Sequence, residues 1–139
     1  MKKRVLFLCT GNSCRSQMAE GWLRRLGGDQ FEVVSAGTHP VGLNPYAVTA
    51  MQEAGVDISN HVSERVDPYL EQQFDYVITV CDRAQENCPI FPGASKMLHW
   101  RFDDPAKAKG TYEQQMVVFR KIRDEIKERI HRFTKEGVS

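Results

Sequence analysis

The sequence predicts an α/β fold in which a parallel sheet is covered by helices on both faces. Short apolar runs of strand length alternate with longer segments whose apolar residues recur every three or four positions. Alternation of this kind is typical of β–α–β units, in which a helix crosses over the sheet to the next parallel strand. No repeat, low-complexity tract or linker interrupts the pattern, so we expect one domain over residues 1–139.

The first β–α–β unit is predicted near the N-terminus. Val5–Leu8 is an apolar run suited to a buried strand. Residues 16–26 place apolar side chains at helical spacing, and the pair Gly27-Gly28 ends this helix. Phe31–Ser35 is then predicted to be the second strand.

The remaining elements continue the alternation. Asn44 followed by Pro45 is typical of an N-cap with proline at the first helical position, and predicts the start of a second helix. Tyr76–Val80 is the third predicted strand, and a short fourth strand is expected near residues 96–99. Residues 112–133 predict a long helix with one buried face.

Two cysteines directly follow predicted strands. Cys9 comes after the first strand and Cys81 after the third. Ligands of open parallel sheets bind at the carboxyl ends of the strands, near the topological switch point. We therefore expect the functional site at this edge, with both thiols close to it.

Composition excludes several function classes. Hydrophobic residues make up 41% of the chain and charged residues 27%, which is typical of a globular protein. The net charge of +1 leaves no electrostatic footprint for nucleic acid or membrane. No apolar stretch approaches a membrane span, and the apolar run after the basic N-terminus is too short for a signal peptide. We expect a cytoplasmic protein and a monomer.

The four cysteines are expected to be chemically used thiols. Structural disulfides are the first alternative for Cys9, Cys14, Cys81 and Cys88, but a chain of this size without an export signal does not need them. A zinc site is the second alternative, and the spacings within the two pairs match it poorly.

The segment from Cys9 to Arg15 predicts an anion-binding loop between a strand and a helix. Gly11 can adopt a positive φ without steric cost, and Asn12 tolerates the left-handed region better than most residues. Such a loop points N–H groups inward, backed by the helix N-terminus, and Arg15 adds a planar fork of donors. The positive field favours Cys9 as a nucleophilic thiolate, to which Ser16 can donate a hydrogen bond.

The alternative is that Cys9 is a small buried hydrophobe and Arg15 a surface cation. Cys14 has two open interpretations: a packed thiol at the helix start, or a partner that protects Cys9 from over-oxidation. The expected substrate-binding residues are Thr10, Gly11, Asn12, Ser13, Cys14, Arg15 and Ser16.

The motif V-L-F-L-C-T-G-N-S-C-R-S-Q-M-A-E-G resembles the opening of the low-molecular-weight protein tyrosine phosphatase fold, and its thioredoxin-coupled arsenate reductase branch most closely. Four further segments resemble that branch: S-A-G at 35–37, G-L-N-P at 42–45, A-G-V-D-I-S at 54–59 and H-W-R-F-D-D-P at 99–105. The resemblance covers about residues 4–133 and implies a four-stranded parallel sheet flanked by helices.

Phosphatase chemistry is one alternative within this family. It needs Cys9, the loop with Arg15, and a general acid, which the resemblance assigns to Asp104 of Asp104-Pro105. An Asp-Pro pair is also ordinary turn chemistry. Relatives that act on phosphotyrosine usually carry aromatic residues directly after this pair, whereas Ala106-Lys107 follow here. This departure weakens the phosphatase alternative and leaves room for a slow side activity. A non-catalytic oxyanion sensor is the third class.

Arsenate reduction is the function that we expect. It needs two electrons, which a dithiol supplies on becoming a disulfide. Adjacent strands lie about 4.8 Å apart, so Cys9 and Cys81 can bridge if their strands are neighbours. If the segment from Cys81 to Cys88 is helical, the two residues are separated by roughly 10.5 Å, which is too far for a disulfide. We therefore predict that this segment loops out or unwinds to form Cys81–Cys88.

The resemblance implies a relay through Cys9, Cys81 and Cys88, whose final disulfide is reduced by thioredoxin. Arsenate is the expected substrate, with phosphate and sulfate as competing oxyanions, and no tightly bound cofactor is expected. Some relatives bind potassium beside the loop, and four residues match that site by position: Asn12, Glu20, Ser35 and Glu64. A hard cation needs several oxygen ligands, and Val62-Ser63-Glu64 departs from the family's Thr-Ser-Asp.

Overall fold

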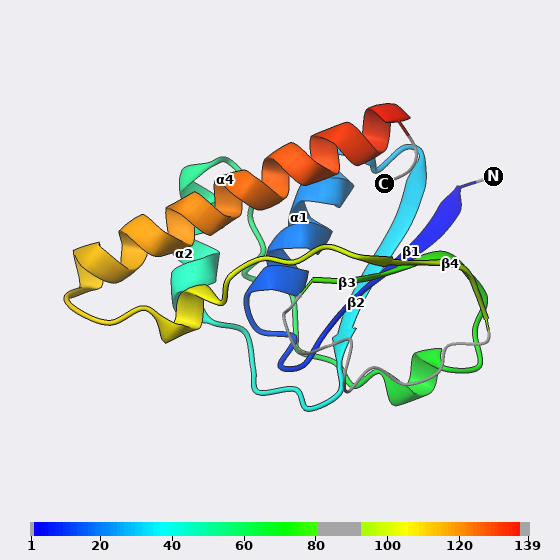
Figure 1. Cartoon of the computed structure of the whole chain (residues 1–139), viewed down its shortest axis with the longest axis horizontal. Coiled ribbons are helices and arrows are strands. Elements are labelled where there is room, and N and C mark those ends of the chain that lie inside the picture. The colour runs from blue at the N-terminus through cyan, green and yellow to red at the C-terminus, as the bar shows by residue number, and fades with distance from the viewer. Residues whose placement is uncertain (1, 81–92, 137–139) are drawn as a thin grey trace.

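The computed structural model describes residues 2–80 and 93–136 and contains the predicted four-stranded parallel sheet (Figure 1). The strands lie in the order β2-β1-β3-β4, and each adjacent pair is parallel. The central position of β1 follows from its sequence, because Val5–Leu8 is apolar throughout and is fully buried on both faces of the sheet. The strands are β1 (Lys3–Cys9), β2 (Phe31–Gly37), β3 (Phe74–Thr79) and β4 (Ala94–His99).

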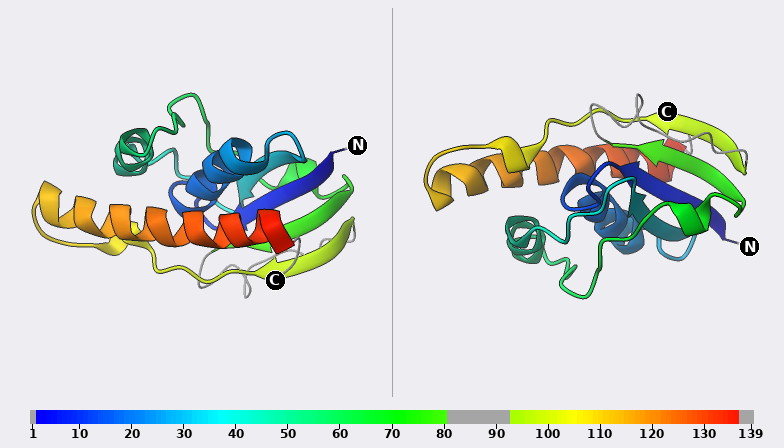
Figure 2. Two further views of the ribbon diagram at one scale, coloured as in Figure 1. Left: turned by 90° about the horizontal axis from the view of Figure 1, so that it is seen from above. Right: turned by 90° about the horizontal axis from the view of Figure 1, so that it is seen from below.

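Three α-helices pack on one face of the sheet. They are α1 (Arg15–Gly27), α2 (Pro45–Glu53) and α4 (Tyr112–Glu136). Their apolar side chains share one core cluster with Val5, Phe7 and Ile78 of the sheet. Both views of Figure 2 show α1 and α4 next to each other alongside the strands.

Within the described residues, a second core covers the opposite face. Leu6, Leu8 and Val77 pack there against Val66 and the side chains around the short 3-10 helix η1 (Asp67–Tyr69). The predicted sheet flanked by helices is thereby confirmed, with α-helices on one described face and η1 on the other. None of the helices that the structure describes is long and apolar enough to span a bilayer.

The predicted helix signals are confirmed in detail. Asn44 caps α2, since its side chain accepts hydrogen bonds from the amides of Tyr46 and Ala47, and Gly55 ends the helix with a φ of +84°. Six apolar residues of α4, spaced three and four apart, are buried: Met116, Phe119, Ile122, Ile126, Ile130 and Phe133. Strands β3 and β4 both begin two residues earlier than predicted, because pairing between Phe74 and Ala94 extends the ladder into a polar segment.

Candidate active site

A pocket of about 240 Å³ opens at the carboxyl end of β1, where the loop of residues 10–14 leads into α1. Parallel strands of this order place a topological switch point beside β1, and ligands of such folds bind there. The pocket is lined by Cys9, Thr10, Gly11, Ser13, Cys14, Arg15, Val41, Asp104 and Ala106.

Arg15 is a buried cation with a donor to spare. Its Nη1 donates to the Phe102 carbonyl at 2.9 Å, and its Nη2 lies 3.5 Å from Asp104 Oδ2. Its buried Nε has no hydrogen-bond partner in the part of the chain that the structure describes. A buried unpaired donor is costly, so this nitrogen is suited to an oxygen of a bound anion.

The start of α1 offers further donors. Cys14 occupies the N-cap position without a side-chain hydrogen bond to the helix, and the first turn carries no acidic residue. The first N–H groups of a helix attract anions because they lack intrahelical partners and lie at the positive end of the helix dipole. The pocket therefore combines a buried thiol, Cys9, with donors for an oxyanion.

The structure shows the turn role of Asp104, and its predicted role as a general acid stays a prediction. Its Oδ1 accepts a hydrogen bond from the Ala106 amide at 3.0 Å and caps the 3-10 helix η2 (Pro105–Lys107). Its Oδ2 faces Arg15 in the pocket that also contains Cys9. Capping therefore fixes the carboxyl group of Asp104 at the pocket lined by Cys9 and Arg15.

Cys14 is a buried thiol held in its protonated form. Burial raises its pKa to about 11, with a smaller rise from the Asp104 charge, while Ser13 and Arg15 act in the opposite direction. Because the thiolate is the reactive form, this supports the packed-thiol interpretation of Cys14 at neutral pH.

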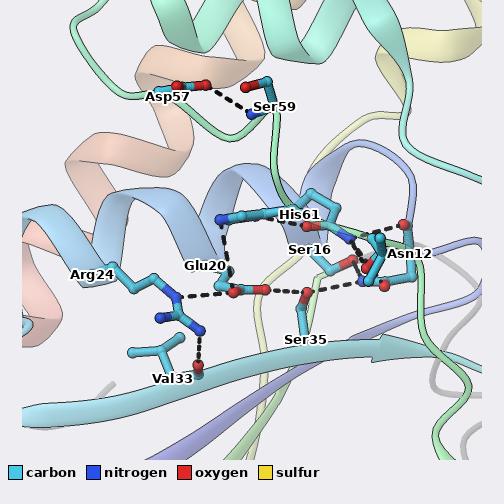
Figure 3. Close-up of polar contacts among 11 residues, drawn as sticks. Asn12, Ser16, Glu20, Arg24, Val33, Ser35, Asp57, Ser59 and His61 are labelled. Atoms are coloured by element: carbon cyan, nitrogen blue, oxygen red, sulfur yellow. Dashed lines mark hydrogen bonds and ion pairs between the residues drawn. The ribbon is translucent and has the colours of Figure 1, made fainter.

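Asn12 is not among the residues that line the pocket, and its side-chain hydrogen bonds hold the loop (Figure 3). It is fully buried and has a φ of +47°, in the left-handed region. Its Oδ1 accepts from the Glu64 amide at 2.8 Å and from Gln17 Nε2 at 3.1 Å, while its Nδ2 donates to Ser16 and Ser35. The Glu64 N–H can only donate, so it fixes which end of the Asn12 amide is the oxygen.

One glycine differs from the prediction, and a second, for which nothing was predicted, is required by the fold. Gly11 does not have a positive φ. Among the described non-glycine residues, Asn12 alone lies in the left-handed region. The hydrogen bonds of the Asn12 side chain compensate the backbone strain of this conformation. Gly37, at the end of β2, was not singled out. A Cβ there would lie 2.5 Å from the Thr10 carbonyl oxygen, so this close approach of loop and strand requires glycine.

Most of the predicted substrate-binding residues line the pocket, and two do not. Thr10, Gly11, Ser13, Cys14 and Arg15 reach its surface, whereas Asn12 and Ser16 are fully buried behind it. The predicted bond from Ser16 to the Cys9 sulfur stays a prediction. Cys81 and Cys88 lie outside the described residues. Sequence reasoning missed Gln17, whose only signal was its place within the resembling motif.

The residues matched to a potassium site do not form an oxygen cage. Asn12 turns its NH₂ group toward Ser35, and Ser35 donates to Glu20 Oε1 at 2.6 Å. Glu64 is exposed and its carboxylate accepts from the Tyr69 hydroxyl at 2.7 Å. Across residues 2–80 and 93–136, moreover, no three His, Cys, Asp or Glu side chains are grouped to hold a metal. The donor set therefore does not fit a hard cation.

A larger hollow lies at the other end of the strands and lacks this chemistry. Its volume is about 560 Å³, and Lys2, Arg4 and Glu32 line it together with Arg24 of α1. The residues that line it include no thiol or hydroxyl side chain, and Arg4 is already paired with Glu32 at 2.6 Å. We therefore assign the active site to the smaller pocket around Cys9.

Comparison with known proteins shows the family of the chain. Residues 4–137 match the family described as low molecular weight phosphotyrosine protein phosphatase. An arsenate reductase of Bacillus licheniformis is 54% identical over 136 residues, which are 98% of each chain.

Solved structures of arsenate reductases also resemble this chain. An arsenate reductase in the phosphate binding state superposes with a TM-score of 0.83 at 33% identity, over 96% of this chain and 98% of that one. A thioredoxin-dependent arsenate reductase of Corynebacterium glutamicum gives a TM-score of 0.76 at 29% identity, over 97% of this chain and 61% of that one.

Proposed function

This chain belongs to the low molecular weight phosphotyrosine protein phosphatase family, and on that premise we propose that it reduces arsenate to arsenite with electrons from thioredoxin. The observation that carries the proposal is its near-full-length likeness, at about half identity, to proteins that are called arsenate reductases. The same likeness favours reduction over the phosphatase alternative.

The pocket supports the first chemical step. Arsenate, like phosphate, is a tetrahedral oxyanion, and the unpaired Nε of Arg15 and the α1 N-terminus are placed to bind its oxygens. Cys9 then attacks arsenic, and Asp104 protonates the departing oxygen so that water leaves. The product of this step is a covalent bond between the Cys9 sulfur and arsenic(V).

The second step transfers the two electrons. In our proposal the Cys81 thiolate attacks the sulfur of Cys9, the sulfur–arsenic bond breaks, and its electron pair stays on arsenic, which leaves as arsenite. Cys88 then attacks Cys81, which frees Cys9 as a thiolate and forms a Cys81–Cys88 disulfide. A thioredoxin dithiol reduces this disulfide by the same exchange chemistry.

The setting follows from the same proposal. The reaction needs no tightly bound cofactor, since the electrons pass between thiols. We propose that the chain acts as a single-domain monomer in the cytoplasm, where thioredoxin is kept reduced.

The test is arsenite formation with thioredoxin, thioredoxin reductase and NADPH. We expect turnover by the wild type, none by Cys9→Ser, and about one arsenite per chain without cycling by Cys88→Ser. Disulfide mapping after arsenate treatment should identify Cys81–Cys88 in the wild type and Cys9–Cys81 in Cys88→Ser. Sustained cycling by Cys88→Ser would disprove the relay, and rapid phosphotyrosine hydrolysis without arsenate reduction would favour the phosphatase.

A further inference from the structure

Glu20 is a buried carboxylate behind the oxyanion loop that the reaction itself does not use. It lies on α1, and its side chain is 10% exposed. Ser35 donates to its Oε1 and accepts from Asn12, which is the residue that gives the loop its left-handed turn. One negative charge is therefore built into the network that shapes the loop, and a buried charge needs a compensating partner.

Two side chains of the chain itself approach the other oxygen of this carboxylate (Figure 3). Arg24 Nε lies 2.9 Å from Glu20 Oε2, as an i,i+4 pair with the glutamate on the N-terminal side. His61 Nε2 lies 3.9 Å from the same oxygen, and its Nδ1 is 2.9 Å from Gln17 Oε1. Both oxygens of Glu20 are thus engaged with protein groups.

Arg24 also ties the carboxylate to the strand that carries Ser35. Its Nη2 donates to the Val33 carbonyl of β2 at 2.7 Å, two residues before Ser35. One guanidinium therefore fixes both Glu20 and the backbone from which Ser35 reaches it. Movement of either partner would be passed to Asn12 through the Ser35 hydroxyl.

We propose that Arg24 is a positioning residue that supplies the counter-charge of Glu20 in place of an alkali cation, with His61 as a further neighbour of the carboxylate. The oxyanion loop then keeps its shape without potassium, which agrees with the poor fit of the surrounding oxygens to a cation cage. An exposed ion pair contributes little by itself, and Arg24 is half-exposed. Arg24 matters because its partner, the Glu20 carboxylate, is buried. Removal of Arg24 leaves this buried charge with only neutral hydrogen-bond donors and His61 as neighbours.

Without Arg24, Glu20 must recruit a cation from solvent. A carboxylate oxygen is a ligand for hard cations, and the vacated position next to Val33 offers a carbonyl oxygen as a second ligand. The inference therefore predicts that loss of Arg24 creates a dependence on potassium that the wild type lacks. A purely structural role of Arg24 predicts no such rescue.

The experiment compares four proteins in two salts. They are the wild type, Arg24→Met, the charge-conserving Arg24→Lys, and Arg25→Met as a matched control. Arg25 is the next residue of α1, and its side chain donates to the Gly55 carbonyl at 3.2 Å, away from Glu20. Calorimetric titration with inorganic phosphate, at fixed pH and ionic strength, is carried out in potassium chloride and in tetramethylammonium chloride.

We expect the phosphate Kd of the wild type, Arg24→Lys and Arg25→Met to agree within twofold between the salts. For Arg24→Met we expect about tenfold weaker binding in tetramethylammonium, recovered at least fivefold in potassium. Melting temperatures in the two salts give a second readout: potassium should raise that of Arg24→Met and leave that of the wild type unchanged.

Three results would overturn the inference: a wild type that loses phosphate affinity without potassium, an Arg24→Met variant with unchanged affinity, or a variant weakened equally in both salts. The wild-type comparison needs no variant to fold. The inference rests on the proposed oxyanion site, but phosphate binding requires no reduction. If the chain failed to reduce arsenate, the proposed function would be disproved, but the phosphate-binding comparison could still be interpreted.

Discussion

The Arg15 guanidinium lies 3.5 Å from the Asp104 carboxylate, measured from Nη2 to Oδ2, inside the pocket that holds the Cys9 thiol. The two residues come from distant parts of the chain, Arg15 from the start of α1 and Asp104 from the segment after β4. A bound oxyanion competes with Asp104 for Arg15, since both are negative. In its ionised form Asp104 therefore opposes substrate binding, whereas the proposed assistance to the leaving oxygen requires its protonated form.

Replacing Asp104 with asparagine separates these two effects. The Asp104→Asn variant keeps the cap of η2, because an amide oxygen can accept from Ala106 as the carboxylate does. We expect the kcat of arsenate reduction to fall by about 100-fold, the lower end of what general acids contribute. We also expect phosphate to bind a few-fold more tightly, because a negative charge has been removed from the site.

Asp103→Asn is the matched control, because Asp103 is exposed and is not among the pocket-lining residues. Steady-state kinetics and phosphate titration should leave this variant within twofold of the wild type. An unchanged kcat in Asp104→Asn would remove Asp104 from the mechanism.

Replacement of Asn12 tests whether the buried network shapes the loop. In Asn12→Ala the side-chain partners lose their bonds and alanine must adopt a φ of +47°. We expect the free energy of unfolding to fall by roughly 3–5 kcal/mol, from unsatisfied buried groups and backbone strain. Urea denaturation measures this, and phosphate affinity should fall at least tenfold in parallel.

Asn12→Gly divides this loss into its two causes. Glycine adopts the left-handed region without strain but makes no side-chain bonds. We expect Asn12→Gly to be more stable than Asn12→Ala by about 1 kcal/mol and still far below the wild type. Equal stability of the two variants would show that backbone strain at this position is unimportant.

Cys14 should make stability depend on alkaline pH. Burial raises its pKa from 9.0 to about 11, so the folded chain holds the thiol proton more tightly than the unfolded chain. This contribution is complete below pH 9 and is lost as the pH rises through 11, because deprotonation then favours unfolding. At a pH of about 10 the loss relative to a pH of about 8 should be roughly 1.4 kcal/mol.

Urea denaturation at these two pH values measures this loss in the wild type and in Cys14→Ala. Tyrosines and lysines titrate in the same range, so the quantity of interest is the difference between the two proteins. The decrease should be smaller in Cys14→Ala by about the predicted amount. An identical decrease in both would assign the pH dependence to other groups.

Much of the fold could be predicted from sequence because its signals are local. The apolar run Val5–Leu8, the Asn44 cap and the spacing of α4 each act within a few residues, and all three are confirmed. The position of Cys9 at the end of a strand was predicted from the same local signals. The first residues of β3 and β4 were not predicted, because pairing between these two strands extends them.

The interior of the site could not be predicted because its contacts join distant segments. Asn12 is held by the amide of Glu64, and Gly37 is required by the backbone of Thr10. No role was predicted for Arg24. Its spacing from Glu20 is local, but only the fold brings its guanidinium to the Val33 carbonyl. Neither spacing nor residue type indicates contacts between distant segments in a single sequence.

The last prediction concerns selectivity between arsenate and aryl phosphates. Ala106, an exposed residue, forms part of the pocket lining and offers no ring for an aryl group to stack on. In Ala106→Tyr an aromatic contact of about 1 kcal/mol becomes available, which corresponds to roughly fivefold in affinity. We expect the KM for p-nitrophenyl phosphate to fall about fivefold, while kcat/KM for arsenate stays within twofold. Lys107→Tyr is the control, because Lys107 is exposed and is not among the residues that line the pocket. A similar fall in KM for both variants would show that the effect of the new ring is not specific to the pocket. An unchanged KM for Ala106→Tyr would show that Ala106 does not set the selectivity of the pocket.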